Sequence, residues 1–318
     1  MFKKRQKKKD YYQDRAKISK SENKRNLKFS IKFNTRFAKT LELHSVGKLK
    51  DELPYLRLSK KEPYIITASD SIMGNRKDQQ DSFFVTSSTP ISPFKLTRSF
   101  AVVCDGMGGL EAGDRASLTA VSMMKLAVDK LPTKKVDIPH FYSQMLDYID
   151  YEINHWNDLK TDKGAGTTMV SIIIENKRLY WASVGDSSIF LFQGNMLKKI
   201  TSEHNYKTYL NRLVLNGKIT KHQAEQDPQQ NALVSYLGMG GVSYRDINPK
   251  PYNLRNGDLL ILCTDGITDT LTEEEMKEII KENIDDVFQC CKNITNTVKE
   301  KKIETQDNAT IVIVQYVE

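Results

Sequence analysis

The chain has 318 residues, of which 39% are hydrophobic and 28% are charged, a composition typical of a soluble globular protein. No apolar run approaches the roughly 20 residues that a membrane-spanning helix needs, and no apolar stretch follows the basic N-terminus, so the sequence predicts neither a membrane span nor a signal peptide. The four cysteines have no paired metal-ligand spacing, which favours reduced thiols in a cytoplasmic protein.

The positive charge is concentrated near the N-terminus. The formal net charge is +8, yet residues 1–50 contain 17 Lys or Arg against 4 Asp or Glu, which leaves a mildly acidic remainder. We predict that residues 1–60 form a basic, partly disordered extension, although residues 27–34 alternate apolar and polar side chains as a half-buried strand does. The extension is interpreted either as a solvated tail or as an arm that contacts nucleic acid, an anionic membrane or an acidic partner.

Residues 61–318 are predicted to form the folded domain. Two amphipathic helices are expected over residues 114–131 and 141–156, because apolar side chains repeat there at helical spacing. A capping box of Thr272 and Glu275 predicts a third helix that continues through Ile280. Strands are expected at residues 100–104, 169–174, 179–184, 189–192, 259–263 and 310–314. This alternation indicates an α+β domain of packed layers.

Aspartates at the ends of predicted strands carry the first functional signal. Asp105 and Asp265 each follow a hydrophobic strand and precede a glycine, which lets backbone carbonyls and a ligand approach closely. Asp81 and Asp307 lie just before other β-rich runs. Carboxylates and carbonyls without histidine or thiol partners suit Mg²⁺ or Mn²⁺, and two such ions can activate a water molecule for attack on phosphorus. Arg76 is placed to clamp the phosphate oxygens.

With these residues in place, the chain resembles the metal-dependent protein phosphatases of type 2C, in their bacterial form. The resemblance covers roughly residues 66–318 and preserves the order and spacing of the motifs. These are Arg76 to Asp81, Asp105-Gly106-Met107-Gly108-Gly109 with Gly113-Asp114, Gly164-Ala165-Gly166-Thr167-Thr168, Val184-Gly185-Asp186-Ser187, Thr201 to His204, Leu237-Gly238, Leu262 to Gly266 with Thr268-Asp269, and Asp307-Asn308-Ala309-Thr310.

The resemblance implies a four-layer α-β-β-α sandwich, with central antiparallel β-sheets flanked by helix pairs and with the metals in a cleft at one end. It implies hydrolysis of phosphoserine and phosphothreonine in proteins in one step, with a metal-bridging water or hydroxide as nucleophile, and signalling opposite a serine/threonine kinase. Arg76 would bind the phosphate, and residues of about 202–245 would include a mobile flap. The implied ligands of the two Mn²⁺ or Mg²⁺ ions are Asp81, Asp105, Asp265, Asp307 and the Gly106 carbonyl.

Some positions depart from the family pattern. Gln79 and Gln80 replace an asparagine and an acidic residue, so one metal site is expected to be weaker, and Leu110 replaces a frequent histidine. Met107 occupies the position where animal members carry a histidine proposed as general acid. A third ion would use an aspartate just before the glycine-rich segment, where Lys163 stands next to that segment and Asp162 one residue further.

Three other residues of the motifs are given structural interpretations. His204 is interpreted as a hydrogen-bonded histidine at the base of the flap rather than as a general acid. Asp186 and Asp269 are interpreted as residues that brace turns.

Two alternatives to an active phosphatase remain open at this stage. The substitutions at Gln79, Gln80 and Leu110 favour a weak or inactive phosphatase fold that acts as a scaffold or sensor. The basic extension alone favours nucleic-acid binding, although no nucleic-acid module is recognisable. All four aspartates are retained, so we predict an active enzyme. A monomer is expected, because no interface is visible in the sequence.

Overall fold

The computed structural model describes residues 63–86, 89–90, 97–108, 112–132, 136–157, 164–230 and 232–318. The strands are β1 (Tyr64–Ile72), β2 (Asp81–Val85), β3 (Thr89–Pro90), β4 (Thr97–Met107), β5 (Gly166–Thr167), β6 (Met169–Glu175), β7 (Arg178–Val184), β8 (Ser188–Gln193), β9 (Met196–Lys199), β10 (Asp246–Ile247), β11 (Tyr252–Asn253), β12 (Leu259–Cys263) and β13 (Ala309–Val317). The helices are α2 (Ala112–Asp129), α3 (Ile138–Asn157), α4 (Tyr206–Leu215), α5 (Lys221–Glu225), α6 (Asp265–Thr268), α7 (Glu273–Glu282) and α8 (Val287–Glu300).

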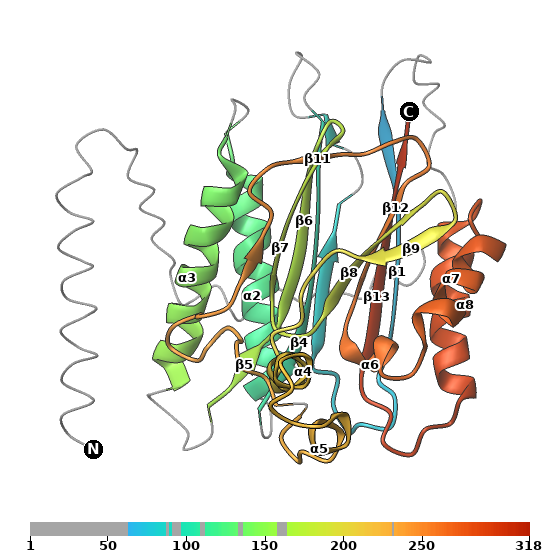
Figure 1. Cartoon of the computed structure of the whole chain (residues 1–318). Helices are drawn as coiled ribbons and strands as arrows, with labels where there is room; N and C mark the ends of the chain where they lie inside the picture. Colours follow the sequence, from blue (N-terminus) through green and yellow to red (C-terminus); the bar gives the residue numbers. More distant parts are fainter. Residues whose placement is uncertain are drawn as a thin grey trace, which may run out of the picture. The chain divides into compact units, whose positions relative to one another are not determined.

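Two antiparallel sheets form the centre of the domain. One sheet has the order β1-β13-β12-β8-β9, and the other has the order β10-β7-β6-β4-β2, with the short strands β3, β5 and β11 added to it. Helices α2 and α3 lie outside the second sheet, and α7 and α8 lie outside the first (Figure 1). The domain is therefore the four-layer α-β-β-α sandwich that the sequence predicted.

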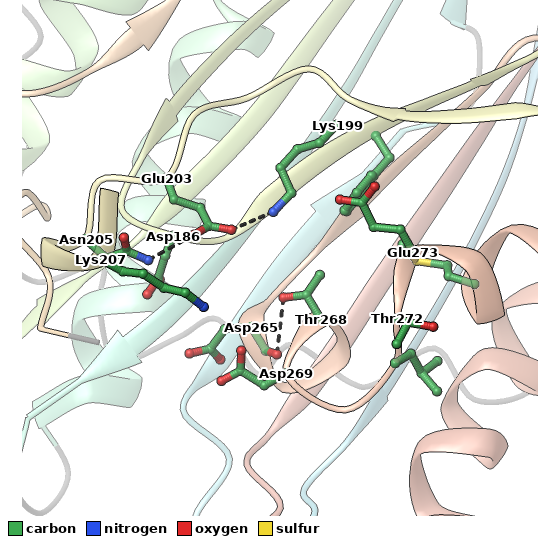
Figure 2. A pocket seen from close by; sticks show the side chains of 13 residues that line it. Asp186, Lys199, Glu203, Asn205, Lys207, Asp265, Thr268, Asp269, Thr272 and Glu273 are labelled. Carbon is green, nitrogen blue, oxygen red and sulfur yellow. Dashed lines mark hydrogen bonds and ion pairs between the residues drawn. The ribbon is translucent and has the colours of Figure 1, made fainter. Parts of the chain in front are cut away.

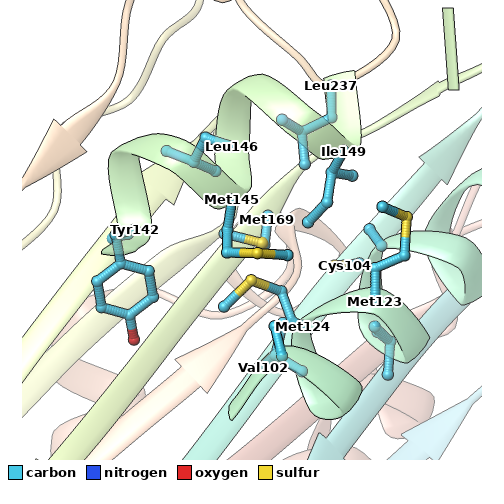
Figure 3. Packing of buried hydrophobic residues seen from close by; sticks show 14 of the residues in the cluster. Val102, Cys104, Met123, Met124, Tyr142, Met145, Leu146, Ile149, Met169 and Leu237 are labelled. Atoms are coloured by element: carbon cyan, nitrogen blue, oxygen red, sulfur yellow. The ribbon is translucent and has the colours of Figure 1, made fainter. Parts of the chain in front are cut away.

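Three apolar clusters fill the three spaces between these layers. The strands that carry Val102 and Met169 pack against Met124 of α2 and Met145 of α3, as Figure 3 shows. Alternate residues of the same strands, such as Val103 and Val170, face the space between the two sheets. The central strands are thus buried on both faces, which fixes the direction and depth of the strand ends that carry the polar residues.

The antiparallel order brings the four predicted aspartates to one end of the sandwich. Asp81 begins β2 and Asp105 lies near the end of β4, and the two residues are direct partners in the β2–β4 pairing. On the other sheet Asp265 follows the end of β12, and Asp307 precedes the start of β13. Because β12 and β13 are also antiparallel partners, the end of one lies beside the beginning of the other.

The helices and strands predicted from the sequence are all present. The two long helices begin and end within about three residues of the expected positions, and the capping box of Thr272 and Glu275 is formed, with both of its reciprocal hydrogen bonds present. The sequence analysis did not predict β1, β2, β9, α4 or α8, nor the shorter elements β3, β5, β10, β11, α5 and α6. Helix α8 escaped notice because its sequence is rich in Val, Ile, Thr and Cys, residues with weak helix propensity, although Cys290, Ile294 and Val298 are buried at helical spacing.

Several predictions fall outside the described residues. These are the basic extension of residues 1–60 with its alternating segment 27–34, the departure at Leu110, and the third-ion aspartate Asp162 with Lys163. The limits of the folded domain and of the flap remain predictions. Within the described part of the chain, no helix is both long enough and apolar enough to cross a membrane.

Candidate metal centre

Asp81 is held by two threonines from the opposite sheet. Its Oδ2 accepts hydrogen bonds from Thr264 Oγ1 at 3.0 Å and from Thr310 Oγ1 at 2.7 Å, while its Oδ1 is buried without any hydrogen-bond partner. Burial, together with the nearby charges of Asp265 and Asp307, raises the pKa of Asp81 to about 7. One carboxylate oxygen is therefore fixed and the other is left free for a ligand.

Asp105 is fixed through its backbone rather than through its side chain. Its N–H donates to Thr168 Oγ1 at 3.0 Å, and its carbonyl accepts from the Thr168 N–H at 2.9 Å and from Thr167 Oγ1 at 2.8 Å. Burial and the charges of Asp265 and Asp81 raise the pKa of Asp105 well above its ordinary value. Because its backbone is held on both sides, the side chain projects from a rigid position.

Asp265 opens the short helix α6 directly after β12. Its carboxyl group is within hydrogen-bonding reach of Asp105, and its Oδ1 is buried without a protein hydrogen-bond partner. Burial first, and then the charge of Asp269, raise the pKa of Asp265 to about 6. The next residue, Gly266, has no room for a side chain, because a Cβ at that position would lie 2.0 Å from the Asn308 carbonyl oxygen.

Asp307 and Arg76 form an ion pair at the rim of this cluster. Arg76 Nη2 lies 2.5 Å from Asp307 Oδ2, and the side chain of Arg76 is 56% exposed. The loop that carries Arg76 approaches Asp307 closely, since a Cβ on Gly74, where φ is +63°, would lie 2.3 Å from the Asp307 carbonyl oxygen. The pair thus joins the predicted phosphate-binding residue, whose side chain is more than half exposed, to a predicted metal ligand.

The predicted backbone ligand Gly106 lies in a crowded position next to Asp105. A Cβ there would meet the Gly113 carbonyl oxygen at 2.1 Å and the Gln80 carbonyl oxygen at 2.7 Å. Gln80 lies against the same turn, with its Nε2 3.4 Å from the Gly108 carbonyl oxygen. The side chain of Gln79 donates to Ser71 Oγ and accepts from the Asp81 N–H, so it contacts the cluster through the backbone of Asp81.

The cluster has the properties of a cation site. Three carboxyl groups with raised pKa values lie together, with Asp81 buried and Asp105 and Asp265 half-buried, and one buried oxygen each of Asp81 and Asp265 has no hydrogen-bond partner. No group of three or more His, Cys, Asp or Glu side chains already closed around a single metal position is found among the described residues. The donor set nevertheless fits hard divalent ions, because uncompensated buried carboxylates are costly unless a cation accompanies them.

A pocket of about 210 Å³ lies beside Asp265, between the loop after β9 and helices α6 and α7. Figure 2 shows Asp186 on the opposite side from Asp265, with Asp269 beside Asp265 at the end of α6 and Lys207 extending in from the start of α4. Burial and the charge of Asp265 raise the pKa of Asp186 to about 7. The side chain of Asp186 accepts a hydrogen bond from its own backbone N–H, and both Asp186 and Asp269 line this pocket, so their interpretation as residues that brace turns remains a prediction.

His204 is a structural residue in the described domain. Its Nδ1 accepts a hydrogen bond from the Gly185 N–H at 3.1 Å, and its own N–H donates to the Gly185 carbonyl at 2.9 Å. Its carbonyl accepts from the Val234 N–H at 2.8 Å, which joins the two ends of the segment that contains α4 and α5. The sequence interpretation of a hydrogen-bonded histidine at this place is confirmed.

Sequence reasoning missed the residues that hold the aspartates in place. Thr264 and Thr310 bond Asp81, and Asn308 bonds three backbone groups of the loop before Asp81. Asn308 Nδ2 donates to the carbonyls of Met73 and Asp78, and its Oδ1 accepts from the Gln80 N–H. The available signal was that all three are polar residues next to a strand end that carries an aspartate.

Comparison with protein-family models gives two matches that together span most of the described domain. Residues 67–208 match the model described as protein phosphatase 2C. Residues 217–317 match the model described as stage II sporulation protein E. All of the predicted site residues lie in one or the other segment.

Individual relatives and solved structures agree with these matches. The chain is 31% identical over 230 residues to the serine/threonine phosphatase stp of Listeria monocytogenes, covering 70% of this chain and 86% of that protein. It is 31% identical over 189 residues to protein phosphatase PhpP of Streptococcus pneumoniae, covering 59% and 74%.

Among solved structures, the serine/threonine phosphatase PstP/Ppp of Mycobacterium tuberculosis has the same fold, with a TM-score of 0.66 at 24% identity over 80% of this chain and 99% of that one. A structure of the PstP catalytic domain in complex with two manganese ions has a TM-score of 0.65 at 22% identity, covering 80% of this chain and 100% of that one. Taken together with the Listeria relative, the fold and the carboxylate cluster, these matches show that the chain belongs to the bacterial branch of the protein phosphatase 2C family, the metal-dependent serine/threonine protein phosphatases.

Proposed function

We propose that the carboxylate cluster holds two Mn²⁺ or Mg²⁺ ions and that Arg76 binds the phosphate of a phosphoserine or phosphothreonine side chain. Asp81, Asp105, Asp265 and Asp307, with the Gly106 carbonyl, are the proposed ligands. The observation that carries this proposal is the pair of buried, unpartnered carboxylate oxygens, Asp81 Oδ1 and Asp265 Oδ1, which come from the two different sheets. A relative in complex with two manganese ions supports the number and kind of ion.

The residues of the chain divide the work at this site. When bound, divalent ions supply Lewis-acid activation of water and neutralise phosphate charge. Thr264 and Thr310 hold Asp81 Oδ2, so that the free Oδ1 keeps its direction. Arg76 has an exposed side chain, and the fork geometry of a guanidinium matches two phosphate oxygens. Because Asp307 pairs with Arg76, the phosphate-binding group is held next to the ion site before substrate arrives.

A third ion, if the protein takes one, is proposed to use Asp162, as the sequence analysis expects. Asp186, which lines the pocket beside the cluster together with Asp265, is a second candidate ligand for it. The substrates are proposed to be phosphoproteins, and the opposing enzyme a serine/threonine kinase.

The test is phosphate release from a phosphothreonine peptide with Mn²⁺, with Mg²⁺ and with EDTA. Wild type should require one of the two metals, and Asp105→Asn and Asp265→Asn should abolish turnover. Asp285→Asn, an exposed residue between α7 and α8, is the matched control and should retain full activity. A folded wild type that binds Mn²⁺ but releases no phosphate from several phosphopeptides would instead favour a binding scaffold.

A further inference from the structure

Asp150 is a buried carboxylate on α3, one of the two helices outside the second sheet. It lies in the fourth turn of α3, and only 5% of the residue is exposed. Its Oδ1 accepts hydrogen bonds from the Gly238 N–H at 2.8 Å and from the Gly240 N–H at 3.2 Å. Within the described residues Asp150 makes no ion pair, and its carboxyl group is hydrogen-bonded by the backbone N–H groups of Gly238 and Gly240. Burial of a charge in this way is costly, which indicates that its position matters.

The segment that Asp150 holds has a backbone that only glycine adopts easily. Gly238 has φ of +103° and Gly240 has φ of +79°. A Cβ on Gly238 would lie 2.6 Å from Ile153 Cγ2 and 2.7 Å from the Ala165 carbonyl oxygen. The neighbouring Leu237 is buried in the cluster that includes Ile149, as Figure 3 shows. The turn is therefore pressed against α3, and the Asp150 carboxylate fixes its two amides.

This turn is connected directly to Asp105. Leu237 and Thr167 form a reciprocal pair of backbone hydrogen bonds, with N···O distances of 2.9 and 3.0 Å. Thr167 Oγ1 in turn donates to the Asp105 carbonyl at 2.8 Å, and the Thr168 N–H donates to the same oxygen at 2.9 Å. Three consecutive contacts thus lead from the Asp150 carboxylate to the backbone of a proposed metal ligand.

We propose that Asp150 is a positioning residue for the metal centre, which sets the placement of Asp105 through the Gly238 turn and the Leu237–Thr167 pair. The proposal rests on the proposed metal site. It predicts that loss of the hydrogen bonds of Asp150 lowers the affinity for metal. Since such coupling is reciprocal, metal binding should also tighten the turn that Asp150 holds.

The first experiment measures Mn²⁺ affinity by calorimetry on full-length wild type, Asp150→Leu and Asp150→Asn, with the melting temperature of each metal-free protein. Asp150→Leu removes the acceptor, and we expect its Mn²⁺ dissociation constant to rise about tenfold, the low end of the effect of residues that orient metal ligands. Asp150→Asn keeps an acceptor oxygen and should stay within about threefold of wild type. Asp147→Ala, one turn earlier on α3, breaks only a more exposed ion pair to Arg245 and should leave the affinity unchanged.

The proposal is overturned if Asp150→Leu melts at a lower temperature but binds Mn²⁺ as wild type does, because the aspartate would then serve stability alone. Absence of Mn²⁺ binding by wild type would instead refute the metal centre itself. A second measurement keeps the proposal testable if Asp150→Leu does not fold. Hydrogen exchange of the peptide that spans residues 236–241 in wild type should slow when Mn²⁺ is added, and unchanged exchange would contradict the coupling.

Discussion

Asp81 on β2 and Asp105 on β4 are direct partners across two antiparallel strands, with their carboxyl groups at the same end of the sandwich. Like charges placed opposite each other on neighbouring strands destabilise a sheet. Both pKa values are raised, chiefly by burial, and the neighbouring carboxylates add to the effect. The site thus stores an unfavourable interaction in the metal-free protein, and a bound cation would relieve it.

Asp105→Asn should therefore stabilise the metal-free protein at pH 7.5. Folding raises the pKa of the Asp81 carboxyl group to about 7. Such a group stabilises the folded protein at a pH below its pKa in the unfolded chain, and this stabilisation is lost as the pH rises through its pKa in the folded protein. Removing the facing charge should recover about 1 kcal/mol, or roughly 2–4 °C in melting temperature. The measurement is thermal unfolding in EDTA.

The same variant should lose the response to metal. Mn²⁺ should raise the melting temperature of wild type, because a ligand that binds only the folded state stabilises it. Asp105→Asn should show little or no such rise, whereas the exposed-site control Asp285→Asn should behave as wild type in both conditions. An equal rise in all three proteins would argue against Asp105 as a ligand.

Arg76→Ala should impair catalysis without loss of metal binding. A hydrogen bond to a charged group contributes about 1.5–3 kcal/mol, so kcat/KM for a phosphopeptide should fall about tenfold to a hundredfold. Arg76→Lys keeps the charge but not the fork, and should recover only part of the loss. Arg255→Ala, an exposed arginine before β12, is the control. The measurement is steady-state kinetics with saturating Mn²⁺. An unchanged kcat/KM in Arg76→Ala would show that Arg76 does not bind the phosphate.

Asn308→Ala should loosen the loop that carries Arg76. The substitution leaves three buried or partly buried backbone groups without their partner, those of Met73, Asp78 and Gln80. We expect a loss of about 2–3 kcal/mol in the free energy of unfolding and a higher KM for the phosphopeptide. Asn293→Ala, whose side chain bonds only other surface side chains, should change stability by less than about 0.5 kcal/mol. Chemical denaturation and kinetics measure the two effects, and an unchanged KM would limit Asn308 to a role in stability.

His204 should make stability depend on pH in the acidic range. Burial lowers the pKa of His204, so the folded state binds fewer protons than the unfolded state and stability falls as the pH decreases below about 6.5. His204→Gln keeps an acceptor for the Gly185 N–H and does not titrate. The difference in melting temperature between wild type and this variant should therefore shrink between pH 7.5 and pH 5.5. His222→Gln, on the exposed helix α5, should show no such change relative to wild type.

The candidate site residues could be proposed from the sequence because their signal is local. Asp105 and Asp265 each stand between a buried strand and a glycine, and this pattern needs only a few neighbouring residues to be recognised. The long helices were equally visible, because their buried residues repeat at a fixed spacing. Helix α8 was overlooked because its residues have weak helix propensity, although its apolar residues repeat at helical spacing. The segment is helical because that apolar face packs against the sheet, not because of the intrinsic preference of its residues.

The sequence by itself determined which residues carry the carboxylates, the arginine and the apolar faces of the layers. Only the tertiary structure decided how those groups are held. Thr264 and Thr310 bond Asp81 across separations of 183 and 229 residues, and Asp150 reaches Gly238 across 88. No local pattern encodes such a partner, because a side-chain hydrogen bond extends only about 3 Å and depends on strand register and on how the layers pack. Short sequence motifs therefore identify the chemical groups of the site, whereas contacts between distant parts of the chain set its geometry.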